Sequence, residues 1–465
     1  MPDLNIAEFF HSVQLFEEHC KGCVNCIKHC PTEAIRVREG KAHIIENKCI
    51  DCGECVRICP NQAKIVITDK LDDLSKYKYN IALPAPAIYG QFLEGTDPWQ
   101  IVATLIKIGF NWVYDVAYAA DIVSEKIRQF VSENKSTRPL ISSACPAVVR
   151  LVQVRFPNLV EHIIPVISPM RLAAQLALEE AIERTGFSKD EIGLFFISPC
   201  PGKVSAAYDP VGFQEKAVTG VISIAEIYPL LYENLVKEQK DIDRYTKGLE
   251  VGSGLGIGWA RSGGEAQSVG GSMQIAVDGI HSVIKILEDV ERGKLSDIDF
   301  IEAQACNGGC VGGVLTVENP YITRRRIRLL ASNMPDNTKL AENLDKIKAV
   351  TKRDEIFIHN KPLMPRPTIK LDNDMVVAIQ KMEQMEQIAK NLPGLDCGSC
   401  GAPNCEALAE DVVRGYATEL DCIFKLREEV SKLAKEMMQL AERVPPSMGK
   451  ADKCGAECDD SSRDS

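Results

Sequence analysis

The sequence predicts a multidomain α/β protein. Its 465 residues are enough for roughly two to four domains, and a hydrophobic content of 45% is enough to build their cores. Between about residues 77 and 366, short apolar runs alternate with amphipathic segments, which is typical of parallel sheets covered by helices. Cysteines cluster at short spacings before, within and after this region, and these clusters indicate separate metal-binding modules.

Charge and composition exclude several classes of protein. The formal net charge is −11 and no basic run is longer than 324–326, so the chain lacks the basic patch of a nucleic-acid-binding protein. The most apolar long stretch, 101–120, is interrupted by charged and polar residues, and we expect no membrane span. The N-terminus has no secretory signal pattern. Eighteen closely spaced cysteines then indicate metal ligation in a reducing cytoplasm, not disulfides.

Residues 1–75 contain an internal repeat, because the pattern C-x2-C-x2-C-x3-C-P occurs twice. Three thiolates at this spacing can hold three corners of a cubane, while the fourth, turned by the proline, reaches the other cluster. The pattern resembles that of bacterial two-cluster ferredoxins and predicts two [4Fe-4S] clusters that carry single electrons. Zinc sites, the alternative, use paired C-x2-C units. The predicted ligand sets are Cys20, Cys23, Cys26 and Cys59 for one cluster, and Cys49, Cys52, Cys55 and Cys30 for the other.

Three cysteines of the central region each lie just past the end of a predicted strand. Cys145 follows P-L-I-S-S-A, Cys200 follows I-G-L-F-F-I-S-P, and Cys306 follows a strand predicted over 297–301. Cys310 comes next, in a glycine-rich turn. Ligands of parallel sheets bind at the carboxyl ends of strands, so these four thiols could converge on one site. Each one alone could equally be a buried structural cysteine.

Three loops of this region resemble the signature loops of iron-only (FeFe) hydrogenases, in the same order. They are S-S-A-C-P-A-V-V (142–149), S-P-C-P-G-K (198–203) and E-A-Q-A-C-N-G-G-C-V-G-G (302–313). A glycine-rich segment at 253–264 is similar to the one beside that family's active site, and it places Trp259 where an aromatic residue is expected. The resemblance extends over the chain to about residue 370 and implies an α/β hydrogenase domain over residues 76–370.

The resemblance also implies roles for individual residues. Cys145, Cys200, Cys306 and Cys310 would hold a [4Fe-4S] cluster. Cys310 would bridge it to a di-iron subcluster with CO, cyanide and azadithiolate ligands, which together form the H-cluster. Lys203 would donate to one cyanide, unless it is simply a solvent-exposed lysine, and Pro86 and Ala87 would approach the other. The iron would hold hydride from H2 while the cofactor's amine takes the proton.

The sequence departs from the catalytic members of this family along the proton path. Ala144 stands where they carry a cysteine, and a methyl group cannot carry a proton. Ile127 and Phe130 stand where acidic relay residues are expected, and Gln304 stands where a methionine is expected near the third loop's first cysteine. These replacements resemble those of sensory hydrogenases, in which the cluster is kept and turnover is slow.

Residues 371–425 contain a helix predicted over 375–392, followed by C-x2-C-x4-C-x16-C. This pattern resembles the small four-cysteine iron-sulfur domain of electron-transfer and corrinoid proteins, and it implies one C-terminal [4Fe-4S] cluster, with zinc as the alternative. Its ligands would be Cys397, Cys400, Cys405 and Cys422.

Apolar residues then recur at alternating steps of three and four, which predicts an amphipathic helix over 426–446. This helix would form a homodimer, dock a signalling partner, or pack on its own domain. The tail, 447–465, is polar and predicted to be disordered, and its Cys454 and Cys458 are too few to form a site alone.

The first functional hypothesis is an H2-sensing hydrogenase-like protein of an anaerobe's cytoplasm. It would slowly cleave H2 and pass electrons to a ferredoxin-like carrier or a signalling protein. One alternative is a catalytic ferredoxin-linked hydrogenase with a different proton path. Another is an iron-sulfur relay or assembly protein without the di-iron site. Either hydrogenase would depend on maturation factors for its CO and cyanide ligands, and we expect neither a nucleic-acid nor a membrane partner.

Overall fold

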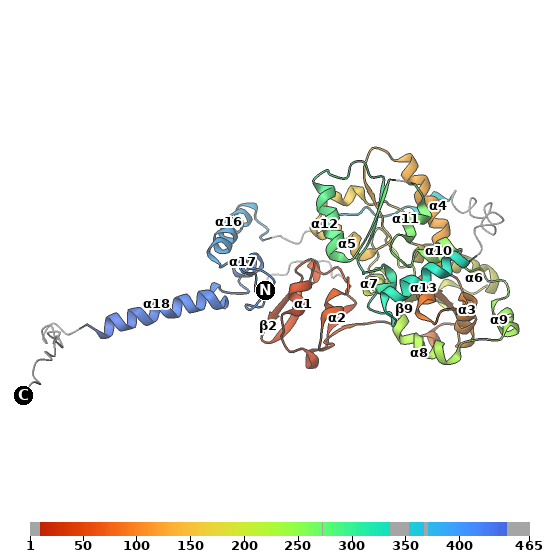
Figure 1. Cartoon of the computed structure of the whole chain (residues 1–465), viewed down its shortest axis with the longest axis horizontal. Coiled ribbons are helices and arrows are strands. Elements are labelled where there is room, and N and C mark those ends of the chain that lie inside the picture. The colour runs from red at the N-terminus through yellow and green to blue at the C-terminus, as the bar shows by residue number, and fades with distance from the viewer. Residues whose placement is uncertain (1–9, 272, 335–352, 367–370, 444–465) are drawn as a thin grey trace, which may run out of the picture. The chain divides into compact units, whose positions relative to one another are not determined.

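The computed structural model describes residues 10–271, 273–334, 353–366 and 371–443 (Figure 1). The chain divides into two compact units, Met1–Lys370 and Leu371–Ser465. The first unit combines parallel sheets and helices with an N-terminal module of short antiparallel strands, and the second is helical. The predicted multidomain α/β fold is confirmed, whereas the individual domain boundaries stay predictions.

The N-terminal module repeats its sequence motif as a structural motif. Each half has one short helix, and each helix carries the third cysteine of its motif, Cys26 or Cys55. Two antiparallel strand pairs, β1 with β4 and β2 with β3, accompany these helices. Ile27 and Ile35 form a small core in which several of the cysteines themselves pack. The elements are β1 (Val13–Leu15), α1 (Asn25–His29), β2 (Ile35–Arg38), β3 (Lys41–Ile44), α2 (Glu54–Ile58) and β4 (Lys64–Val66).

A four-stranded parallel sheet forms one half of the central region. Its order is β6-β5-β8-β9, and β5 and β8 pair along their whole lengths, with Ile81 opposite Leu194. The strands are buried and helices cover them, which explains their unbroken apolar runs. The predicted strand at Tyr79–Pro84 is confirmed, and the helix predicted over 99–108 spans Pro98–Lys107. The elements are β5 (Tyr79–Pro84), α3 (Pro98–Lys107), β6 (Trp112–Val113), β8 (Ile192–Ser198), α7 (Pro201–Tyr208), β9 (Gly220–Ser223), α8 (Ile224–Asn234) and α9 (Gln239–Thr246).

A second parallel sheet, of order β10-β11-β7, forms the other half. The strand predicted at 297–301 is β11, but it lies three residues later, at Phe300–Gln304, because these residues pair with β10 and β7. Glu302 and Gln304 are therefore buried strand residues, and an apolar pattern could not reveal this. The elements are β7 (Leu140–Ile141), α5 (Pro146–Arg155), α10 (Gly254–Gly258), α11 (Gly264–Val269), β10 (Gln274–Asp278), α12 (Ile280–Glu291), β11 (Phe300–Gln304), α13 (Pro320–Asn333) and α15 (Asp354–Phe357).

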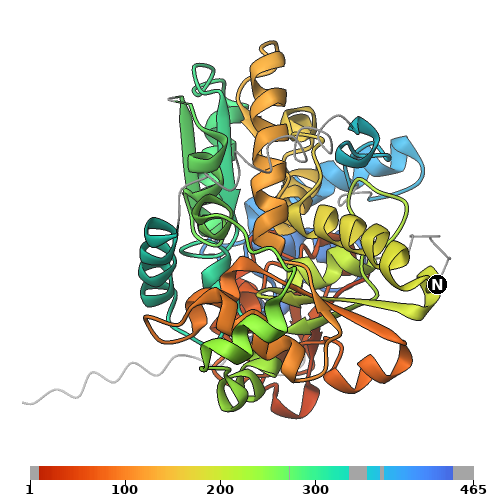
Figure 2. The ribbon, with the colours of Figure 1, turned by 90° about the vertical axis from the view of Figure 1, so that its right-hand side faces the viewer.

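Helix α4 (Val116–Glu133) runs through the middle of this unit, where it packs against α6 (Pro169–Thr185), α10 and α11 (Figure 2). Asp115 caps its first turn by accepting a hydrogen bond from the backbone N–H of Ala117 at 3.0 Å. Most of the first twelve residues of α4 are buried. The helix is thus fixed at its N-terminal end, close to the ends of the strands that precede the cysteine loops.

The second unit consists of α16 (Met375–Asn391), α17 (Cys405–Val413), the 3-10 turn η8 (Glu419–Asp421) and α18 (Ile423–Ala441). The helix predicted over 375–392 is confirmed apart from its last residue. The predicted helix over 426–446 corresponds to α18, which has no buried residue; positions 444–446 and the tail with Cys454 and Cys458 lie outside the described residues. Within the described ranges, no helix is both long and apolar enough to cross a membrane.

Candidate iron-sulfur active site

Four cysteines from three loops come together between the two parallel sheets. Cys145 and Cys200 are the N-caps of α5 and α7, Cys306 follows β11, and Cys310 opens the 3-10 turn η7 (Cys310–Gly312). Burial raises the pKa of Cys306 well above its usual value, and the neighbouring thiols of Cys200, Cys145 and Cys310 raise this pKa further. The structure therefore places all four predicted ligands in one cluster.

The surroundings of these thiols fit an iron-sulfur cluster. Burial raises the pKa of Cys200 to about 11 and that of Cys310 to about 12, and the other thiols add to both shifts. A metal group would replace the protons of the three thiols whose pKa is raised, Cys200, Cys306 and Cys310, and would compensate the charge of the thiolates. The partial positive charge at the N-termini of α5 and α7 also favours thiolates at Cys145 and Cys200.

The glycines of the third loop are required by close packing. Gly309 has φ 94°, and a Cβ there would lie 2.4 Å from Oε1 of Gln304 and 2.5 Å from the backbone nitrogen of Ser262. A Cβ at Gly313 would lie 2.1 Å from the carbonyl oxygen of Pro199, next to Cys200. The loop that carries Cys306 and Cys310 is thus pressed against the loop that carries Cys200, and larger residues would separate them.

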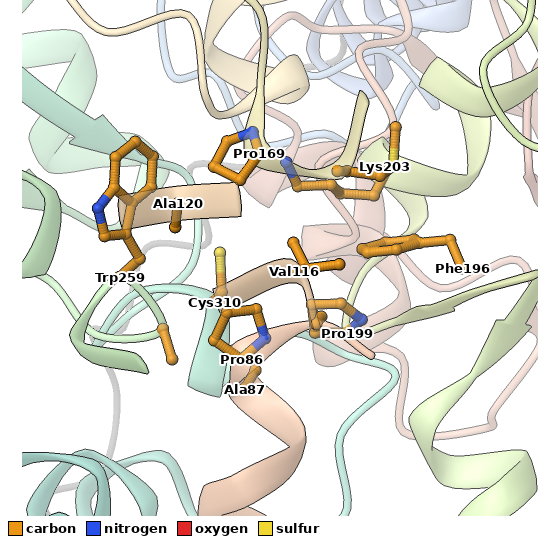
Figure 3. A pocket seen from close by; sticks show the side chains of 13 residues that line it. Pro86, Ala87, Val116, Ala120, Pro169, Phe196, Pro199, Lys203, Trp259 and Cys310 are labelled. Atoms are coloured by element: carbon orange, nitrogen blue, oxygen red, sulfur yellow. The ribbon is translucent and has the colours of Figure 1, made fainter. Parts of the chain in front are cut away.

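A cavity of about 50 Å³ lies beside Cys310 (Figure 3). In Figure 3 the thiol of Cys310 and the amine of Lys203 point into the same space, with Trp259 on one side and Phe196 on the other. Most of the walls are apolar, so a polar group bound here would be shielded from water. The lining residues are Ala85, Pro86, Ala87, Val116, Ala120, Pro169, Met170, Phe196, Pro199, Lys203, Trp259, Ala260 and Cys310.

Lys203 is held in place by its helix and by one hydrogen bond. It is the third residue of α7, three positions after Cys200, and its Nζ donates to the carbonyl oxygen of Ala144 at 2.8 Å. The side chain is half-buried, so the alternative of a solvent-exposed lysine does not hold. An ammonium group has three N–H donors, and among the described residues one of them has an acceptor, the carbonyl of Ala144. The others can donate to an anionic ligand in the cavity.

The other predicted site residues differ in their positions. Pro86 and Ala87 line the cavity from η4 (Pro86–Gln91), directly after β5. Trp259 lines it too, and its indole N–H donates to Oγ of Ser124 at 2.9 Å, which fixes the ring. Ala144 contributes only its carbonyl to Lys203, and Gln304 is buried at the end of β11 against Gly309, without lining the cavity.

The acidic residues near this site lie where the sequence did not predict them. Ile127 is buried in the apolar core, so the family's relay position on α4 carries no proton here. Instead, Oγ of Ser142 donates to both carboxylate oxygens of Glu265, at 2.7 and 2.8 Å, and accepts from the backbone N–H of Ala144 at 3.1 Å. Glu302 lies close to Glu265 and accepts backbone N–H groups of α11 and the residue before it.

Burial raises the pKa of Glu265, and the neighbouring carboxyl of Glu302 raises it further, while Ser142 and Lys203 oppose the shift. Burial likewise raises the pKa of Glu302. Two buried carboxyls this close cannot both ionise easily, so they share protons near neutral pH. The sequence signal for these two carboxyls was weak: Glu265 follows a glycine-rich segment and Glu302 interrupts a strand-like apolar one, where a charged residue is unusual.

The N-terminal cysteines form two groups, each with one cysteine from the other half of the repeat. Burial raises the pKa of Cys26 to about 11, and Cys23, Cys20 and Cys59 add to the shift. Burial raises the pKa of Cys52 well above its usual value, and the thiols of Cys30, Cys55 and Cys49 raise it further. Both fourth cysteines accept a backbone N–H, from Ala34 to Cys30 and from Ala63 to Cys59.

One of these groups lies against the central site. Helix α2 carries Arg57, whose Nη2 donates to the carbonyl oxygen of Gly312 at 2.8 Å, in the loop of Cys310. Asp51, between Cys49 and Cys52, accepts from Nη1 of the fully buried Arg150 at 3.2 Å. These contacts fix the module to the central domain beside the loop of Cys310.

The four cysteines of the second unit also gather. Burial raises the pKa of Cys400, and the thiols of Cys397 and Cys422 add to the shift. Cys405 begins α17 and packs in the same small core as Cys400 and Cys422. Its backbone N–H donates to Asp396 at 2.8 Å, which holds the loop closed around the thiols.

Comparisons with known proteins agree with this arrangement. Residues 78–274 and 272–314, half of the chain, match the family profile described as "Iron only hydrogenase large subunit, C-terminal domain". The chain belongs to the iron-only hydrogenase family. Residues 13–60 match a 4Fe-4S dicluster domain, and residues 392–424 match a putative Fe-S cluster domain, so this hydrogenase-family protein binds iron-sulfur clusters.

The relatives include hydrogenases and assembly factors. The periplasmic [Fe] hydrogenase large subunit of Nitratidesulfovibrio vulgaris is 31% identical over 214 residues, which cover 42% of this chain and 50% of the relative. Iron hydrogenase 1 of Clostridium pasteurianum is 23% identical (50% of this chain, 40% of the relative). A probable cytosolic Fe-S cluster assembly factor of Brugia malayi is 21% identical (53% and 65%). The chain thus spans less than two thirds of each of these relatives.

The chain also aligns with solved [FeFe]-hydrogenase structures. [FeFe]-hydrogenase HydA1 from Chlamydomonas reinhardtii aligns with a TM-score of 0.47 and 17% identity. The alignment covers 63% of this chain and 98% of that chain.

Proposed function

We propose that this protein is an H2-responsive hydrogenase of low turnover that carries an H-cluster and reports on H2 through its iron-sulfur clusters. The observation that carries the proposal is the shared apolar cavity into which Cys310 and Lys203 both point (Figure 3). A cluster that only transfers electrons needs four thiols, but it needs neither a cavity nor a half-buried ammonium group beside one of them. The chain therefore fits a second metal group next to the cubane.

The residues of the cavity fit a di-iron subcluster with anionic ligands. When bound, this group would supply an open iron for H2 and an amine that takes the proton. Cys145, Cys200 and Cys306 would hold the cubane, and Cys310 would hold both metal groups. Lys203 would donate a hydrogen bond to an anionic ligand, and the apolar walls would exclude water and strengthen that bond.

Proton transfer explains why we expect slow turnover. The side chain of Ala144 cannot take a proton, and α4 presents Ile127 in place of an acid. Ser142 and Glu265 are the proton-carrying groups that lead away from this position, and Glu302 follows them. A route through a hydroxyl and two buried carboxyls with shifted pKa values transfers protons, but it starts one group farther from the cavity than a thiol at position 144 would.

Electrons would leave through the cluster that Cys49, Cys52, Cys55 and Cys30 hold, since Arg57 joins that cluster's helix to the loop of Cys310. We propose that the recipient is a ferredoxin-like carrier or a signalling protein, and that the C-terminal cluster takes part in this transfer. The exposed apolar stripe of α18 supports docking or homodimer formation, because six of its residues are 41% to 70% exposed. These residues are Ile423, Leu426, Val430, Leu433, Met437 and Leu440.

An iron-sulfur assembly or relay role is the second candidate. It is favoured by the relatives from Brugia malayi and Caenorhabditis elegans that are named as probable cytosolic Fe-S cluster assembly factors. Such a protein would load the cubanes and leave the cavity without a di-iron group. The position of Lys203 weighs against this reading, because nothing in a plain cubane site requires its amine.

Infrared spectroscopy in the CO and cyanide stretching region separates the two functions. The full chain would be reconstituted anaerobically with iron, sulfide and a synthetic di-iron precursor, and recorded under argon and then under H2. We expect bands that shift reversibly with H2, and we expect Cys310→Ser to lose them while its N-terminal cubanes still load. Full cubane loading without any such bands would overturn the hydrogenase proposal and leave the assembly role.

A further inference from the structure

A second, larger cavity lies beside the first turn of α4. Its volume is about 320 Å³, which is within the range of small-molecule sites. None of the predicted cluster ligands lines it, and its walls come from β6 with the turn after it, α4, α6 and the segment before α10. The lining residues are Trp112, Val113, Tyr114, Asp115, Tyr118, Glu180, Arg184, Gly248, Leu249 and Glu250.

Three aromatic side chains form a continuous wall of this cavity. The rings of Trp112 and Tyr114 pack edge to face with centroids 5.7 Å apart, and those of Tyr114 and Tyr118 do the same at 6.2 Å. The guanidinium of Arg184 already lies 4.5 Å from the ring centre of Trp112. Faces of aromatic rings attract cations, and Trp attracts them most strongly, so this wall favours positive charge.

The charges of the cavity are mainly negative. Three carboxylates, those of Asp115, Glu180 and Glu250, face one cation, Arg184, which pairs with Glu180. The Asp115 carboxylate already accepts hydrogen bonds from the backbone N–H groups of Ala117 and Gly252. Glu250 is exposed and forms no ion pair with any residue in the described ranges. A negative charge next to an aromatic wall is thus left open to solvent.

Tyr118 connects Glu250 to the aromatic wall. Burial raises the pKa of Tyr118 well above its usual value, and the Glu250 carboxylate adds to this shift. The phenol therefore stays protonated and donates to the Glu250 carboxylate. Aromatic faces beside a carboxylate that no cation of the described residues pairs with are together the parts of a cation site.

We propose that this cavity binds a small organic cation, such as an alkylamine or a quaternary ammonium compound, against Tyr114, Tyr118 and Trp112 with its charge near Glu250. An anion would meet two or three carboxylates and a single arginine that is already paired. A purely apolar ligand would desolvate the open carboxylate of Glu250 without supplying a counter-charge. A cation satisfies both the ring faces and the open carboxylate.

The position of this cavity couples it to the active site. Asp115 and Tyr118 line the cation cavity, and Val116 and Ala120, from the same first turns of α4, line the cavity beside Cys310. A ligand in one cavity therefore contacts the helical turn that forms a wall of the other. The binding proposal itself does not depend on the hydrogenase proposal, because it requires no metal group.

Calorimetric titration of the full, cluster-loaded chain tests the proposal, with choline and agmatine as probes and acetate as the anionic comparison. We expect one saturable site for at least one cation and none for acetate. Glu250→Gln should weaken cation binding about three- to tenfold, because it removes the open charge. Arg184→Gln should tighten binding by a similar factor, because it uncovers the Trp112 ring and removes the competing cation.

Glu183→Gln is the matched control, since Glu183 is an exposed carboxylate on α6 that does not line the cavity. It should bind the probes as the unmodified chain does. Melting temperature and cluster absorbance show whether each variant is folded. The proposal is overturned if no cation binds up to about 10 mM, if Glu250→Gln and Glu183→Gln bind alike, or if Arg184→Gln weakens binding.

Discussion

Replacing Glu265 by glutamine tests whether this buried carboxyl carries the protons of the site. In the unmodified chain, the hydroxyl of Ser142 donates to the Glu265 carboxylate at 2.7 Å. Glutamine has the same shape, and its amide oxygen can still accept this hydrogen bond. The substitution therefore removes the exchangeable carboxyl proton and little else. Among the described residues around Ser142, Glu265 is the one titratable partner of its hydroxyl.

A positioned proton carrier contributes about 10²- to 10⁴-fold to a rate. Because Ser142 contacts the backbone of Ala144 and the carboxylate of Glu265, we expect Glu265→Gln to lower H2/D2 exchange at least about 100-fold, or about 2.7 kcal/mol of barrier. Mass spectrometry of the exchanged gas measures this even when net turnover is slow. The infrared bands should remain, which would show that the metal site is intact.

The same variant has a second readout in stability. The folded pKa of Glu265 is raised above its unfolded value, so the wild-type chain is relatively most stable below about pH 4 and loses stability as the pH rises toward the folded pKa. Glu265→Gln should lose less stability than the wild type over this range, as measured by melting temperature. This result would confirm that the carboxyl is buried and protonated.

Asp121→Asn is the matched control, because Asp121 is also buried with a raised pKa, but its carboxylate accepts from the N–H and hydroxyl of Ser253. It should reduce stability and leave exchange within about threefold of the wild type. If Glu265→Gln exchanges as fast as this control, protons leave by another route and the reasoning fails.

Three further outcomes are expected. Ala144→Cys should raise turnover about tenfold or more, because a thiol can accept a proton between the cavity and Ser142; Ala144→Ser should raise it less, and dye-coupled H2 oxidation measures both. Ser253→Ala should lower stability by about 1–2 kcal/mol in thermal unfolding, because Ser253 caps α10 and donates to Asp121. Leu433→Glu should reduce the mass measured by light scattering if α18 forms a homodimer, whereas Lys432→Glu, on the exposed surface of the same helix, should not change it.

The sequence predicted the cysteine groups well because their information is local. Spacings of two and three residues set which thiols can reach one metal, and the structure brings Cys20, Cys23 and Cys26 near Cys59 as the repeat implied. Cys145 and Cys200 lie far apart in the chain, but each follows the carboxyl end of a buried parallel strand, where ligands of parallel sheets bind. Topology thus predicted the sheet edge at which each thiol lies, whereas the packing of the two sheets, with β7 in one and β8 in the other, brings these edges together.

The carboxyl pair could not be predicted in the same way. Glu265 and Glu302 are on α11 and β11, and only the packing of these elements brings them together. Strand β11 also starts later than the apolar pattern indicated, which hid the burial of Glu302. Gln304 was expected beside the active site because of its place in the loop. It is instead the last residue of β11, and its side chain lies against Gly309. Side-chain direction depends on register, and a single sequence does not fix register.

The surroundings of Ile127 also indicate why placing a glutamate at this position of α4 should not create a fast enzyme. Ile127 lies in the apolar core with Val123 and Trp259, so a glutamate there would be buried without an established partner and would stay protonated. The hydroxyl of Ser142, which accepts from the backbone N–H of Ala144, already donates to Glu265 on α11. Ile127→Glu should therefore destabilise the fold and leave exchange low, and an increase comparable to that of Ala144→Cys would show that protons still pass along α4.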